Sequence, residues 1–373
     1  MAIGRFEKAK RDFVVTAKAN INRAKRGFSP IEPAMSAAVD TVLAGQKHWP
    51  YLAAKGGEHL VFSFDDPRLQ GIVYKVNYFE SLPLLTAWYE GEDAMERKLD
   101  LMREEMDQRT AKLNQMRDYF GFNAVPPQRF VIKKLPVTDS LIMALKAERL
   151  VQGMDLPKEL PVWTCVQRKI KKPEGQTYSL NGYYPESKVK FGRSWSREDI
   201  ETYDAAHDVL FGGPLSELDQ ASQEKWVLLE YPELLPLWQA KIGDPVFKKE
   251  LQQVVKKLIA YTQETGELME LAGAENLVLL KEKAGWQVKL FDALPMKGVS
   301  MESLRGITAK LKSGRSLTLQ QRYVAMNGLN TLRFINALAL IAEVPERMVE
   351  PDVMAVPAET WRQEIAKIFV DKA

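Results

Sequence analysis

The sequence predicts an α+β fold in which a small antiparallel β lobe precedes a mainly helical lobe. Strand-like runs gather between residues 55 and 167, helical apolar spacing dominates the second half, and one β-hairpin interrupts those helices. A chain of 373 residues is long enough to bury a sizeable core and to divide into two lobes. We place a basic helical N-terminal arm at 1–50, the β lobe at 51–170 and the helical lobe at 171–373.

The β lobe reads as strand, strand, helix, strand, strand. Asp65-Asp66-Pro67 separates the first two strands and is typical of a turn. Methionines and leucines at helical spacing then predict a long helix, which Gly121 ends. We expect strands over 59–64, 71–78, 129–132 and 162–167, and helices over 95–116 and 140–151.

The second half is mainly helical, with one β interruption. We expect helices over 199–210, 245–263 and 320–342, and a hairpin whose strands are 276–280 and 286–292. The segment 171–195 is rich in Lys, Gly, Pro and Tyr without a period, which indicates a loop-rich junction between the lobes.

Composition excludes several classes of protein. Hydrophobic residues make up 46% and charged residues 27%, which is typical of a globular chain. Cys165 is the single cysteine, and the three histidines show no zinc-binding spacing, so a disulfide scaffold and a structural zinc site are excluded. We see neither a secretory signal nor an apolar stretch of the roughly 18 residues that a membrane span needs. These observations favour a cytoplasmic protein without a membrane span.

The positive charge is concentrated near the N-terminus. Residues 1–30 carry eight basic and two acidic side chains, whereas the whole chain has a net charge of only +3. A basic helix can contact phosphate or an anionic membrane. Because the overall charge is small, we favour a solvated helical arm and argue against nucleic acid as a partner.

The predicted hairpin carries the clearest chemistry. Asn276 begins its first strand and Asp292 ends its second, so antiparallel pairing brings the two side chains together. Oxygen ligands of this kind suit Mg²⁺. Phosphoryl transfer from ATP needs such a metal site, a cation for the phosphates and a group that orients the acceptor hydroxyl.

Three parts of the chain resemble the protein-kinase-like superfamily. The run 55–64, with Gly56 and Gly57, and the following strand with Lys75 look like a short glycine-rich loop and a strand that bears a phosphate-binding lysine. The long helix occupies the place of the helix that carries a partner glutamate. The hairpin is similar to the end of the catalytic loop and the magnesium-binding aspartate. The first part is similar to bacterial kinase-like proteins of the PhoP regulatory network, and the resemblance covers about half of the chain.

The resemblance implies a two-lobed protein-kinase-like fold that binds ATP with Mg²⁺. Gly56 and Gly57 would let backbone amides approach the phosphates, which Lys75 would hold. Glu105 would pair with Lys75, because helical spacing places it on the flank of the buried stripe whereas Glu104 faces away. The backbone of 165–169 would bind adenine.

For the second lobe, the resemblance implies that Asn276 and Asp292 ligate magnesium. The family's catalytic aspartate, expected five positions before Asn276, is replaced by Leu271. Glu270 is the nearest carboxylate and the candidate catalytic base. Ala293-Leu294 follows Asp292 in place of Phe-Gly.

Three functions remain open at this point. The chain is an ATP-dependent kinase that acts on a protein or small-molecule hydroxyl without the usual aspartate, or a pseudokinase that acts as a regulatory binding module. The third is a helical interaction or nucleic-acid-associated protein that uses its basic arm. In that case Lys75 is a strand lysine that snorkels, and Asp292 only caps a turn.

Overall fold

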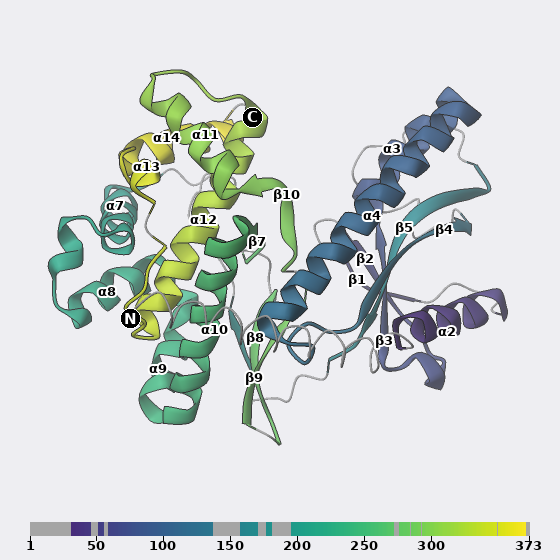
Figure 1. Ribbon diagram of the computed structural model, residues 1–373, viewed down its shortest axis with the longest axis horizontal. Coiled ribbons are helices and arrows are strands. Elements are labelled where there is room, and N and C mark those ends of the chain that lie inside the picture. The colour runs from purple at the N-terminus through teal and green to yellow at the C-terminus, as the bar shows by residue number, and fades with distance from the viewer. Residues whose placement is uncertain are drawn as a thin grey trace, which may run out of the picture. The chain divides into compact units, whose positions relative to one another are not determined.

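The computed structural model describes residues 31–45, 51–55, 59–136, 157–170, 177–180, 195–271, 276–283, 285–291, 293–348 and 350–370. The chain divides into two compact units, residues 1–171 (unit 1) and 172–373 (unit 2). Both units combine helices with small antiparallel sheets (Figure 1). The predicted α+β class is therefore confirmed. The basic segment 1–30 and the helix expected over 140–151 lie outside the described residues.

Unit 1 is built on a five-stranded antiparallel sheet with the strand order β1-β2-β3-β5-β4. Its strands are β1 (Tyr51–Lys55), β2 (His59–Ser63), β3 (Ile72–Asn77), β4 (Gln128–Pro136) and β5 (Glu159–Arg168). All four predicted strands are present, and β1 is an additional one. The interior of β5 is buried along its whole length, because β5 is a central strand with both faces covered.

Helices cover both faces of this sheet (Figure 1). They are α2 (Ile31–Gly45), α3 (Tyr78–Glu90) and α4 (Glu92–Phe120), and a short 3-10 helix, η1 (Pro67–Leu69), precedes β3. On one face, Tyr74 of β3 shares a core cluster with Val39 of α2. On the other face, Trp163 of β5 packs with Met102 and Met106 of α4. The Met-rich stripe of the long helix is therefore a packing surface.

Unit 2 surrounds one buried helix with other helices and two small sheets. Its helices are α7 (Arg197–Phe211), η2 (Pro214–Glu217), α8 (Gln220–Glu230), η3 (Pro232–Leu234), α9 (Leu235–Gly243), α10 (Pro245–Thr265), α11 (Met301–Lys312), α12 (Leu319–Ile341), α13 (Pro351–Met354) and α14 (Ala358–Val370). Its strands are β6 (Thr177–Leu180), β7 (Glu267–Met269), β8 (Leu277–Glu282), β9 (Gly285–Leu290) and β10 (Pro295–Ser300). Three of these helices, α7, α10 and α12, and the β8–β9 hairpin were predicted.

The predicted loop-rich junction is wrong at one place. Within 171–195, β6 pairs with β8 and completes a three-stranded sheet with the order β6-β8-β9. This strand is four residues long and has polar neighbours, so its conformation depends on the partner strand rather than on a local apolar pattern.

The central helix of unit 2 is α12 (Figure 1). Its side chains contact the helices on several sides, and every residue from Gly328 to Ile341 is buried. Among the described helices, α12 is long and apolar enough to cross a membrane, but 94% of its apolar window is buried inside the fold. Its composition is therefore explained by its place in the core.

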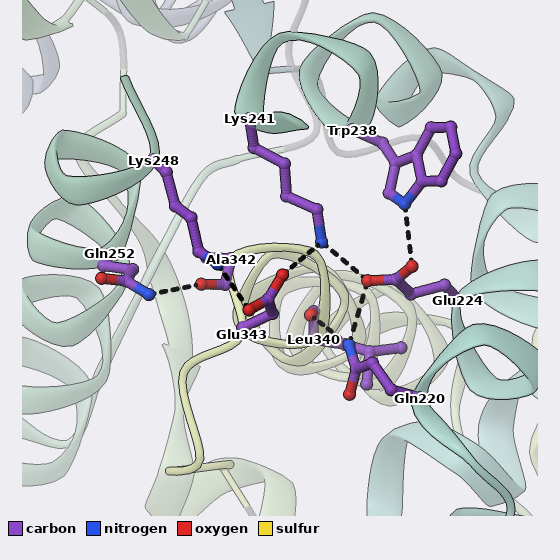
Figure 2. A network of polar contacts seen from close by, with 9 residues as sticks. All are labelled: Gln220, Glu224, Trp238, Lys241, Lys248, Gln252, Leu340, Ala342 and Glu343. Atoms are coloured by element: carbon purple, nitrogen blue, oxygen red, sulfur yellow. Dashed lines mark hydrogen bonds and ion pairs between the residues drawn. The ribbon is translucent and has the colours of Figure 1, made fainter. Parts of the chain in front are cut away.

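Polar side chains complete the C-terminal end of α12 (Figure 2). The side chain of Gln220 donates to the carbonyl oxygen of Leu340 at 3.1 Å, and Gln252 donates to that of Ala342 at 2.9 Å. The last carbonyls of a helix have no partner within the regular helix. Gln252 supplies one for Ala342, whereas Gln220 adds a second bond to Leu340, which also accepts from the amide of Glu343 at 3.0 Å.

A buried lysine lies at the centre of the same network. Lys241 Nζ is 2.7 Å from Glu224 Oε1 and 3.1 Å from Glu343 Oε1, and Lys248 Nζ is 2.5 Å from Glu343 Oε2 (Figure 2). Burial raises the pKa of Glu224, but hydrogen bonds from Lys241, Gln220 and Trp238 outweigh it and hold that pKa below its usual range. The ionised carboxylate is therefore the form that stabilises this end of α12.

We expect Glu224→Gln to lower the free energy of unfolding at pH 7 by about 3 kcal/mol, because it leaves the Lys241 ammonium buried with less compensation. A group with a depressed folded pKa stabilises the fold above its unfolded pKa of about 4.3, and loses that effect as pH falls through the folded value. The difference between wild type and variant should therefore shrink in acid. Urea unfolding measures it. The control is Glu217→Gln, which removes an exposed carboxylate on η2. Equal stability of the two variants would contradict the stabilising role of Glu224.

Glu343 adopts a left-handed backbone conformation, with φ of 55°, directly after the end of α12. Glycine is favoured at this position because it has no Cβ to clash. Glu343→Gly and Glu343→Ala both remove the ion pairs, but only the glycine relieves the backbone. We expect the glycine variant to be more stable than the alanine variant by about 1 kcal/mol. Thermal unfolding of the two variants side by side tests this, and an alanine variant of equal or greater stability would refute it.

Candidate functional site

Lys75 lies in the middle of β3 and is only 7% exposed. Its partner across the sheet is Cys165 of β5, and its neighbours along β3, Tyr74 and Val76, belong to the core on the α2 side. Because side chains alternate along a strand, Lys75 projects from the opposite face, which α4 covers. A buried ammonium is costly unless polar or charged groups compensate it. This burial distinguishes Lys75 from a lysine that snorkels at a sheet edge.

The end of this face near Lys75 is polar. Gln128 of β4 and Gln167 of β5 are 5% and 3% exposed, and they lie opposite each other in the sheet. The thiol of Cys165 donates to Gln128 Oε1 at 3.8 Å. Sequence analysis missed both glutamines. One signal was available for Gln167, because Trp163, Cys165 and Gln167 alternate along β5 and therefore share the Lys75 face.

Glu105 lies on the flank of α4, on the same side of the sheet as Lys75. Its side chain is 15% exposed, and its Oε1 is 3.7 Å from Arg109 Nη2. The Arg109 guanidinium in turn lies 4.7 Å above the ring of Trp163. Arg109 is a second cation at this site that sequence analysis missed, although Glu-to-Arg spacing of four residues is a recognised helical ion pair.

For the predicted phosphate loop, the structure describes only the two strands that flank it. Gly56 and Gly57 lie outside the described residues. They join β1 to β2, whose antiparallel pairing begins at Lys55 and Leu60. The structure thus shows the hairpin that carries the two glycines, and their proposed contact with phosphate stays a prediction.

The prediction that the backbone of 165–169 binds adenine is wrong for two of its amide donors, those of Arg168 and Lys169. The amide of Arg168 donates to the carbonyl oxygen of Pro127 at 2.9 Å, and that of Lys169 donates to Gly71 at 2.8 Å. Both groups are used in holding the sheet together, because β5 has neighbours on both sides. Neither amide is therefore free to donate to a ligand.

In unit 2, backbone and side-chain bonds bring Glu270 and Asn276 together. Asn276 is 6% exposed, and its Nδ2 donates to the carbonyl oxygen of Glu270 at 3.0 Å. The amide of Phe291 donates to the carbonyl oxygen of Asn276 at 3.0 Å, and that of Glu270 donates to Leu294 at 3.4 Å. Asp292 itself lies outside the described residues. The geometry leaves the side-chain oxygen of Asn276 as the atom suited to a hard cation.

The position expected to hold a catalytic base is apolar. Leu271 is fully buried, whereas Glu270 is half-buried beside it. Within the described ranges, no three His, Cys, Asp or Glu side chains gather to hold a metal ion. A magnesium site at the hairpin would therefore combine the oxygen of Asn276 with Asp292, which lies outside the described residues.

Comparisons with known proteins do not assign this chain to a family. No protein-family model matches it, and no curated protein is similar to it. One similar solved structure comes from a complex of the Shewanella oneidensis toxin–antitoxin proteins HipA and HipB with operator DNA. It is 10% identical, the match covers 90% of this chain and 72% of that one, and the TM-score is 0.20. A likeness this small carries no argument about fold or function.

Proposed function

We propose that this chain is a kinase-like protein that binds ATP with Mg²⁺ and, if active, transfers the terminal phosphoryl group to a hydroxyl of a protein or small molecule. The observation that carries the proposal is the buried ammonium of Lys75, which projects from the sheet face that α4 covers with Glu105 on its flank. A polyphosphate is a ligand whose charge complements such a cation. Lys75 is assigned to the phosphates and Glu105 to the orientation of Lys75.

The hairpin of unit 2 supports the metal half of the proposal. Asn276 is held by two hydrogen bonds, one through its side-chain nitrogen and one through its backbone oxygen. A fixed amide oxygen together with the carboxylate of Asp292 supplies hard-oxygen ligands that suit Mg²⁺ bound to phosphates. Asn276 and Asp292 are therefore assigned to the metal.

Thermal unfolding tests nucleotide binding directly. MgATP at 100 times its dissociation constant stabilises the folded state by about 2.7 kcal/mol, and the Tm should rise by roughly 5 °C. We expect Lys75→Met to lose this rise, because methionine keeps the apolar stem and removes the charge. Lys134→Met, on the exposed part of β4, is the matched control and should respond like wild type.

Two results would contradict the assignment. A wild-type protein whose Tm is unchanged by MgATP, with calorimetry also showing no heat of binding, would overturn nucleotide binding. A Lys75→Met variant that binds MgATP like wild type would remove Lys75 from the site.

The metal assignment has its own test. Asn276→Ala and Asn276→Asp both lose the hydrogen bond to Glu270, but only the aspartate retains an oxygen ligand. We expect the alanine variant to bind MgATP about tenfold more weakly, while the aspartate variant stays near wild type. ATP with EDTA in place of Mg²⁺ should bind all three proteins alike. Equal loss in both variants would show that the hydrogen bond, not a metal ligand, is what matters.

A second candidate function is that of a pseudokinase, which binds nucleotide and does not transfer phosphate. The burial of Leu271 favours it, because the position where the resemblance expects a catalytic aspartate is closed to solvent. Phosphate release and autophosphorylation assays on the wild type separate the two functions. If transfer occurs, Glu270→Gln should abolish it without changing nucleotide affinity, because Glu270 is then the base.

A further inference from the structure

Gln167 has a buried hydrogen-bond donor without a partner. Its side chain is 3% exposed, and its Nε2 makes no hydrogen bond within the part of the chain that the structure describes. Leaving such a donor unpaired costs about 1–3 kcal/mol. In contrast, the neighbouring Gln128 has its side-chain oxygen paired with the thiol of Cys165.

The unpaired donor lies next to the proposed phosphate-binding lysine. Lys75 pairs with Cys165, and Gln167 is two residues further along β5 on the same face. Diagonal neighbours of this kind have backbones about 7–8 Å apart, a distance that long side chains span. A ligand whose phosphates contact Lys75 therefore extends past Gln167 if it follows the strand.

The backbone amides that follow Gln167 are not available as donors to a ligand. The amides of Arg168 and Lys169 are bonded to Pro127 and Gly71. Gln167 is thus the group on this segment that has a hydrogen to donate and no acceptor for it among the described residues.

We propose that the side-chain amide of Gln167 donates a hydrogen bond to the base of the bound nucleotide, and so contributes to the selection of the ligand. The inference rests on the proposed function, since it takes Lys75 as the phosphate-binding group. The acceptor is a ring nitrogen or a carbonyl oxygen of the base. Such a bond replaces an unpaired buried donor, so a ligand without a base loses a hydrogen bond at this position.

Calorimetry with two ligands tests the assignment. One is MgATP and the other is magnesium tripolyphosphate, which has the phosphates and no base. We expect Gln167→Leu to bind MgATP about tenfold more weakly and tripolyphosphate as wild type does. Lys75→Met should weaken both. The Tm of Gln167→Leu without ligand should equal or exceed that of wild type, because leucine removes the unpaired donor. A residue with only a structural role would not weaken MgATP binding while leaving tripolyphosphate binding and the Tm undiminished.

The controls separate failure of this inference from failure of the proposed function. The side-chain oxygen of Gln128 is already paired with the thiol of Cys165. We therefore expect Gln128→Leu to keep wild-type affinity for MgATP. If Gln167→Leu binds MgATP unchanged, weakens both ligands equally, or unfolds at a lower temperature without ligand, the role of Gln167 is overturned. If the wild-type protein binds neither ligand, the proposed function is contradicted instead.

Discussion

Covering both faces of the five-stranded sheet buries most side chains of its central strands β3 and β5. On the α2 face the cost is small, since the side chains of the core cluster are apolar apart from the hydroxyl of Tyr74. On the α4 face it buries Lys75 and Gln167, and the side-chain nitrogen of Gln167 has no hydrogen-bond partner among the described residues. The same packing that stabilises unit 1 therefore buries the polar side chain of Gln167 on the sheet face that also carries Lys75.

At two places in unit 2, polar groups are paired with other side chains or with the backbone of the same unit. The end of α12 is completed by Gln220 and Gln252, and the buried Lys241 has two carboxylates. At the hairpin, Asn276 is fixed by the chain around it, with its amide nitrogen committed to Glu270. Such satisfied groups position a side chain precisely, which is what a metal ligand needs.

The sequence could predict the elements whose apolar pattern is local. The alternation around Leu60 and Phe62, the methionine stripe of α4 and the hairpin at Asn276 all have a period that matches their observed structure. It could not predict β6, which is a strand only because β8 pairs with it. Nor could it show that Gln167 is buried, because that depends on β4 and α4 arriving from distant parts of the chain. The predicted donors at Arg168 and Lys169 failed for the same reason, since their acceptors come from other segments.

Binding and transfer place different demands on this chain. Binding a metal–nucleotide complex needs a cation and oxygen ligands, roles that the proposed function gives to the buried Lys75 and to Asn276, whose side-chain nitrogen donates to Glu270. Transfer also needs a group that orients the acceptor hydroxyl. An aspartate in place of the fully buried Leu271 would have to be dehydrated, at a cost that the surrounding apolar packing does not offset. If the proposed transfer occurs, its base has to come from a neighbouring, more exposed position, and the half-buried Glu270 is the carboxylate adjacent to Leu271 in the chain.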